Sequence, residues 1–163
     1  MRRLIKFLHT MGAIGFMGSL AALVVLAGLA PAPASLSGYA LIRSAMAEIA
    51  AWIILPSIGL TLIPGLMAIA VAPALHNAGW AWAKAATGIL IFAGGLHALA
   101  PIREEARLSA EALAGGLDSA TLAGVSGGEK VTLWVLLLVS TFNVVLGVWR
   151  PRLSRAPATR QAS

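Results

Sequence analysis

The sequence predicts an all-α membrane protein, a four-transmembrane-helix bundle with both termini in the cytoplasm. The 163-residue chain is 59% hydrophobic and only 11% charged, whereas soluble domains average about 45–50% apolar and about 25% charged residues. Four apolar stretches approach or exceed the roughly 20 residues that a helix needs to cross about 30 Å of hydrocarbon. There is no convincing internal repeat, so we expect a single transmembrane domain over residues 1–163.

The first two spans are expected at residues 5–29 and 49–72. The first is too long for the apolar region of a signal peptide, which is about 7–15 residues, so we expect it to stay uncleaved. Residues 39–48 extend the second span as one helix beyond the membrane. Pro56 and Pro64 lie inside this helix and predict a kink, where neighbouring groups satisfy the freed carbonyls.

The third and fourth spans are expected at residues 80–100 and 131–149, where Pro101 and Pro151 stop them. Apolar residues with helical spacing follow the third span and predict a short helix lying at the membrane interface; they are Ile102, Ala106, Leu113 and Leu117. Residues 150–163 form a basic cytoplasmic tail.

The basic residues set the predicted orientation. Of the 12 lysines and arginines, three lie in the first six positions and four in the last 14. The positive-inside rule therefore places both termini in the cytoplasm of a multi-pass protein, which we expect in a bacterial inner membrane. The net charge of +6 belongs to the chain ends rather than to a basic domain, so we expect lipid and not nucleic acid as the partner. Cysteine is absent, which excludes disulfides and thiolate metal sites.

Polar residues within the spans gather at two depths, given a helical rise of about 1.5 Å per residue. We expect His9, Lys84 and Asn143 in the cytoplasmic half, with His76 on the connection below. His97 lies about 20 Å farther out than Lys84, and we expect Arg43, Met46 and Glu48 near it.

Each of these residues also has a purely structural interpretation. His9 lies at the interface and bonds a neighbouring backbone, Lys84 extends to the headgroups, and Asn143 joins two helices. His76 is a solvated loop residue, His97 is structural, and Arg43 and Glu48 are a charge pair or are solvated. Gly12, Gly15 and Gly18 let another helix approach, or leave room for a flat macrocycle. An ionisable residue in lipid is nevertheless a functional candidate, above all His9.

Several motifs resemble the CopD and HemJ-type membrane proteins, and the layout is most similar to a related branch known as a domain of unknown function. The motifs come from all four spans: "IKFLHTMGAIGFMG", "ILPSIGLTLIPGLMAIA", "GWAWAKAATGILIFAGGLH" and "WVLLLVSTFNVVLGVWRP". The resemblance implies a small bundle that binds haem b for redox chemistry or electron transfer. In the protoporphyrinogen oxidases of this group, a first-helix histidine and a third-helix lysine are the functional pair, and these correspond to His9 and Lys84.

On this interpretation His9 is the axial metal ligand, and Lys84, as the catalytic residue, holds a propionate or a substrate carboxylate. Asn143 is part of the same cofactor site. The second ligand of the iron is His76 or Met67, or the iron has no second ligand. Two alternatives remain. The protein is an accessory or assembly subunit of a larger membrane complex or a homo-oligomer, or it transports copper through His9 and its methionines.

Overall fold

The computed structural model describes residues 2–76 and 78–149, and almost all of this part is helical. The elements, in chain order, are α1 (Arg2–Leu29), α2 (Leu36–Ile49), η1 (Ala50–Ile54), α3 (Leu55–Val71), α4 (Pro73–His76), α5 (Gly79–Leu113), η2 (Ser119–Thr121) and α6 (Gly127–Trp149). The segment η1 is a turn of π-helix and η2 is a 3₁₀ turn.

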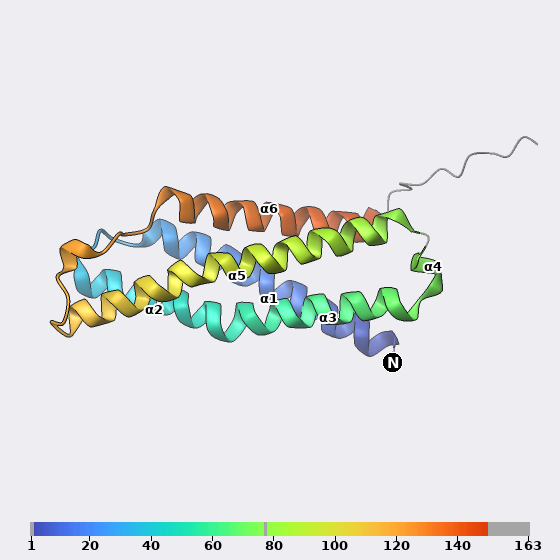
Figure 1. The fold of residues 1–163 in the computed structure, drawn as a ribbon, viewed down its shortest axis with the longest axis horizontal. Helices are drawn as coiled ribbons and strands as arrows, with labels where there is room; N and C mark the ends of the chain where they lie inside the picture. The colour runs from blue at the N-terminus through green and yellow to red at the C-terminus, as the bar shows by residue number, and fades with distance from the viewer. Residues whose placement is uncertain (1, 77, 150–163) are drawn as a thin grey trace, which may run out of the picture.

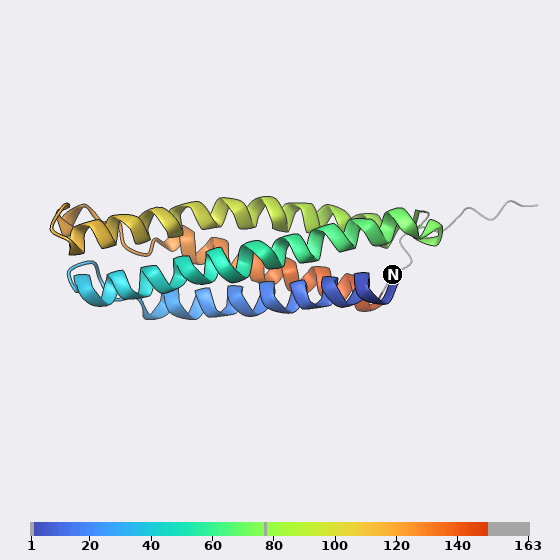
Figure 2. The ribbon, with the colours of Figure 1, turned by 90° about the horizontal axis from the view of Figure 1, so that it is seen from below.

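The long helices form an elongated antiparallel bundle (Figures 1 and 2). Four helices are long and apolar enough to cross a membrane: α1, the continuous α2–η1–α3, α5 and α6. The order around the bundle follows from the contacts, since α1 packs against α3 and α6, and α5 packs against α2, α3 and α6. We call the end that holds α4 and the start of α1 the terminal end, and the other end the loop end. The all-α four-helix prediction is confirmed.

A dry core fills the middle of the bundle and its loop-end half. Its fully buried members include Leu23, Met46 and Ile102, none of which exposes more than 1% of its surface. Large apolar side chains such as Ile14, Trp52 and Leu138 are exposed on the outside of the bundle. Lipid tails provide the apolar surroundings that such an outer surface requires, so the chain is a multi-pass membrane protein.

The second span is one continuous helix, as predicted. It includes the predicted extension at residues 39–48 and begins three residues earlier, at Leu36, while η1 interrupts it shortly before Pro56. Proline has no N–H to donate to the preceding turn. In η1 the backbone hydrogen bond spans one residue more than in an α-helix, since the Leu55 N–H donates to the Ala50 carbonyl. A π-turn of this kind is one of the known ways in which a helix accommodates such a break.

The prediction that the third helix ends at Pro101 is wrong, because α5 continues to Leu113. Tertiary contacts outweigh the break. Beyond the proline, Ile102, Ala106 and Ser109 are buried, and this half of α5 packs along α2. The segment after Pro101 is therefore part of the bundle wall and not a separate interfacial helix.

The fourth helix begins at Gly127, earlier than predicted, and its end at Pro151 lies outside the described residues, as does the basic tail. Ser126 explains the early start. Its hydroxyl oxygen accepts a hydrogen bond from the Glu129 N–H at 3.0 Å, which satisfies one of the free donors of the first helical turn.

Candidate functional site

The terminal half of the bundle carries half-buried polar side chains at the level where the apolar core ends. His9 lies on α1 and is directed at α3. Its Nδ1 is 2.6 Å from the carbonyl oxygen of Thr61, three residues before Pro64 in α3. A carbonyl only accepts, so Nδ1 carries the proton and Nε2 of the neutral ring is left with a free lone pair.

Lys84 and Asn143 join α5 to α6 through reciprocal hydrogen bonds. The Lys84 ammonium donates to the Asn143 side-chain oxygen at 2.8 Å and to its backbone oxygen at 3.0 Å. In return, the Asn143 amide donates to the Lys84 carbonyl at 3.1 Å and to the Thr87 hydroxyl at 2.7 Å. Gly147 makes room for the lysine, since a Cβ there would lie 2.9 Å from Lys84 Nζ. The depth estimate that grouped Lys84 with Asn143 is confirmed.

His9 and Lys84 lie at a common level but on helices that face each other across the bundle. A Cβ at Gly88 would be 3.9 Å from both Asn143 Nδ2 and Leu62 Cδ1, and Leu62 follows the Thr61 that His9 contacts. The two groups make their hydrogen bonds to different neighbours, His9 to α3 and Lys84 to α6.

Atoms of α3 occupy the space beside two of the glycines near His9, where a side chain would otherwise stand. A Cβ at Gly12 would lie 2.6 Å from the Thr61 hydroxyl oxygen and 2.8 Å from the Leu60 carbonyl carbon, and one at Gly15 would overlap the Ser57 hydroxyl oxygen. The helix-packing interpretation is therefore confirmed at Gly12 and Gly15. Gly18 has no atom within 4 Å of the same position.

The two candidates for a second ligand lie toward the end of the bundle. His76 ends α4, and its Nε2 is 2.9 Å from the Ile69 carbonyl oxygen, while its own carbonyl accepts from Trp82 at 2.9 Å. Met67 is 47% exposed on α3. The described contacts bring neither residue to His9.

The sequence left Arg43 and Glu48 as a charge pair or as solvated residues; the pairing is wrong, and only Glu48 is exposed to the surroundings. Arg43 is 1% exposed, and its Nη1 lies 2.7 Å from Oε1 of Glu129, whose side chain is 8% exposed, while Glu48 is exposed. Arg43 also donates to the Pro101 carbonyl at 3.4 Å. The signal in the sequence was an arginine among small and apolar residues, which requires a buried partner. That partner is 86 positions away in the chain.

A second buried network was not anticipated. The Tyr39 hydroxyl donates to Glu105 at 2.7 Å, and the same carboxylate oxygen accepts from the Gly124 N–H at 3.2 Å. Gly124 has a φ of +73°, a conformation that glycine adopts without strain. This network fixes the loop before α6 against α2 and α5.

We expect Asn143→Ala to lower the free energy of unfolding by about 1–2 kcal/mol, because interhelical hydrogen bonds in membranes contribute roughly that much. Unfolding of the detergent-solubilised protein in a denaturing detergent, followed by tryptophan fluorescence, measures the change. Thr141→Ala is the control. Its hydroxyl donates only within α6, to Leu137, so the unfolding midpoint should stay close to that of the parent protein.

Comparison of the chain with known protein families, with curated proteins and with solved structures gives no match.

Proposed function

We propose that this multi-pass membrane protein binds haem b through His9, for redox chemistry or electron transfer, as in the CopD and HemJ-type proteins that it resembles. The observation that carries the proposal is the His9–Thr61 hydrogen bond at 2.6 Å. Histidines that ligate metals generally donate their other ring N–H to a carbonyl or carboxylate, which fixes the tautomer and orients the ring. His9 has this arrangement, with Nε2 left over as the ligand atom.

Lys84 supports an anionic ligand at the same level. In the part of the chain that the structure describes, both acceptors of its ammonium group belong to Asn143 and are uncharged. A half-buried cation without a counter-ion favours an incoming carboxylate, since charge-assisted hydrogen bonds are roughly twice as strong as neutral ones. A haem propionate or a substrate carboxylate provides that charge, and either would be bound by Lys84 as the proposed catalytic residue.

The residues restrict how the group would be held. His9 provides one ligand nitrogen, and the filled positions at Gly12 and Gly15 exclude a ring system from between α1 and α3 there. Haem iron, when bound, supplies reversible one-electron transfer. The protein's own contribution is to fix the Nδ1–H tautomer of the neutral ring through the Thr61 carbonyl, which leaves Nε2 as the ligand atom, and to place a cation nearby.

The location and orientation of the protein belong to the same proposal. We infer a bacterial inner membrane with the terminal end of the bundle in the cytoplasm, because the basic residues gather at the two chain ends. His9, Lys84 and Asn143 then lie in the cytoplasmic leaflet.

The absorbance spectrum of the purified protein tests haem binding. We expect a Soret band that His9→Ala abolishes, because the axial nitrogen is lost. His97→Ala is the matched control, since it removes an exposed histidine at the loop end and should leave the band unchanged. Rescue of a protoporphyrinogen-oxidase-deficient bacterium would separate an oxidase from a haem carrier.

A colourless preparation under conditions that load haem would contradict the proposal. Copurification of the colourless protein with a larger complex would then favour the accessory or assembly role. Copper transport is the remaining alternative, and it predicts copper uptake that depends on expression. Met46, one of the soft ligands it requires, is 0% exposed in the apolar core, far along the bundle from the polar cluster around His9.

A further inference from the structure

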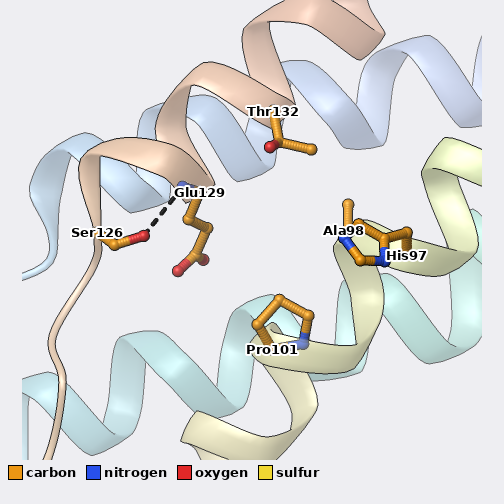
Figure 3. Close-up of a pocket in the computed structure, with 6 residues that line it drawn as sticks. All are labelled: His97, Ala98, Pro101, Ser126, Glu129 and Thr132. Carbon is orange, nitrogen blue, oxygen red and sulfur yellow. Dashed lines mark hydrogen bonds between the residues drawn. The ribbon is translucent and has the colours of Figure 1, made fainter.

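The loop-end half of the bundle contains a pocket that the proposed haem site does not use. It has a volume of about 130 Å³ and lies between α5 and α6, lined by His97, Ala98, Pro101, Ser126, Glu129 and Thr132 (Figure 3). A water molecule occupies about 30 Å³ of the liquid, so the space suits about four waters or one small polar group.

The polar atoms at this pocket are mainly hydrogen-bond acceptors. Glu129 directs its carboxylate toward the space bordered by His97 and Pro101 (Figure 3). One of its oxygens, Oε1, accepts from Arg43 at 2.7 Å, and among the described residues no hydrogen bond reaches the other. The Thr132 hydroxyl already donates to the Gly128 carbonyl at 2.8 Å, so its oxygen is left to accept. Ser126 also lines the pocket, and its hydroxyl oxygen already accepts from the Glu129 N–H at 3.0 Å.

The position of the pocket selects the kind of molecule that reaches it. Glu129 and Lys130 are the last charged residues before the apolar run of α6, which places the pocket where lipid headgroups meet the hydrocarbon. The carboxylate is 8% exposed and already paired with Arg43, so a free cation would add net charge to a confined site. A zwitterionic headgroup adds no net charge. The exposed side chain of Lys130, in the same helical turn as Glu129, provides a cation for its phosphate.

We propose that this pocket binds a primary ammonium group, the headgroup chemistry of an ethanolamine phospholipid. An ammonium has three N–H donors, and the free Glu129 oxygen and the Thr132 hydroxyl oxygen are acceptors for two of them. A choline headgroup carries the same charge but has no N–H to donate. The site therefore distinguishes the two lipids by hydrogen bonding and size, not by charge.

Native mass spectrometry of the full-length protein in detergent tests this proposal. The protein is titrated with phosphatidylethanolamine and phosphatidylcholine of identical acyl chains. We expect about a tenfold preference for phosphatidylethanolamine, since a hydrogen bond to a charged group is typically enough for a factor of that size. Equal binding of the two lipids by the parent protein would overturn the proposal.

Two matched variants identify the pocket. Thr132→Val removes an acceptor and should reduce the preference to about threefold, whereas Thr141→Val, which removes a hydroxyl with the same intrahelical bond outside the pocket, should keep it. Glu129→Gln keeps the shape of the side chain, but with its amide oxygen held by Arg43 it turns an NH₂ donor instead of an acceptor toward the pocket, and should abolish the preference. A preference that persists in both Thr132→Val and a folded Glu129→Gln would place the lipid elsewhere and refute the assignment.

A second arm distinguishes a lipid from a soluble amine. Ethanolamine is added to protein in phosphatidylcholine micelles, and its binding is followed through the ring resonances of His97. Binding of phosphatidylethanolamine without free ethanolamine identifies the lipid as the ligand, and the reverse identifies a soluble amine. If neither binds, the pocket does not recognise an ammonium group.

Discussion

Glu129→Leu should lower the free energy of unfolding by about 3–5 kcal/mol, because it leaves the Arg43 charge buried without a partner. Arg43 is 1% exposed, and its Nε already lacks a hydrogen-bond partner among the described residues. The double variant Arg43→Met/Glu129→Leu removes both charges and should recover most of the loss, since apolar replacements of buried pairs are often neutral or stabilising.

Unfolding of the detergent-solubilised variants in a denaturing detergent, followed by tryptophan fluorescence, gives the four corners of this cycle. The exposed pair between Glu104 and Arg107, joined at 2.7 Å on one face of α5, is the control. Glu104→Leu should leave the unfolding curve nearly unchanged, because water and salt already screen that pair. A Glu129→Leu protein as stable as the Glu104→Leu protein would show that Arg43 is not buried as described.

Gly12→Ala should lower the free energy of unfolding by about 1–3 kcal/mol, in the range of overpacked cores. The added Cβ would lie 2.7 Å from the backbone nitrogen of Thr61 and 2.8 Å from the carbonyl carbon of Leu60. Backbone atoms cannot rotate away as a side chain end can, so α1 and α3 must separate. The same separation would lengthen the His9–Thr61 hydrogen bond one turn away, so we also expect weaker haem retention if His9 is the ligand.

Gly18→Ala is the matched control on the same helix. No atom lies within 4 Å of the Cβ that it adds, and alanine favours a helix over glycine by about 0.5–1 kcal/mol. The same denaturation assay should show Gly18→Ala at or above the stability of the parent protein. If both variants were equally destabilised, the cause would lie in α1 itself and not in its contact with α3.

The depth of the candidate-site residues along the bundle was predictable from the sequence, but the hydrogen-bond partner of His9 was not. A rise of about 1.5 Å per residue and the direction of each span place Lys84 opposite Asn143, and their hydrogen bonds confirm it. The same reasoning placed His9 at this level. It did not predict the bond to the Thr61 carbonyl, because level along the bundle says nothing about how far each helix is rotated about its own axis.

The loop end was harder to predict from the chain. Pro101 is a strong helix breaker in isolation, yet α5 continues because Ile102, Ala106 and Ser109 beyond it are buried, and α5 packs along α2. The capping residue Ser126, which starts α6 early, precedes a pair of glycines that resemble a plain loop. At Pro101 tertiary contacts outweighed the local helix-breaking signal, and at Ser126 the local capping signal was too weak to recognise.

The apolar composition and its division into four long runs determined by themselves that this protein crosses a membrane with four helices, because hydrocarbon admits only long apolar helices whose backbone groups are internally bonded. Only the tertiary structure decided which groups meet: Arg43 with Glu129, His9 with Thr61, and α3 in the positions left open by Gly12 and Gly15. Whether a residue is suited to lipid depends on its own chemistry, which can be read directly from the sequence. Partner choice depends on the relative rotation and depth of helices that are distant in the chain, which only the packing of the whole bundle sets.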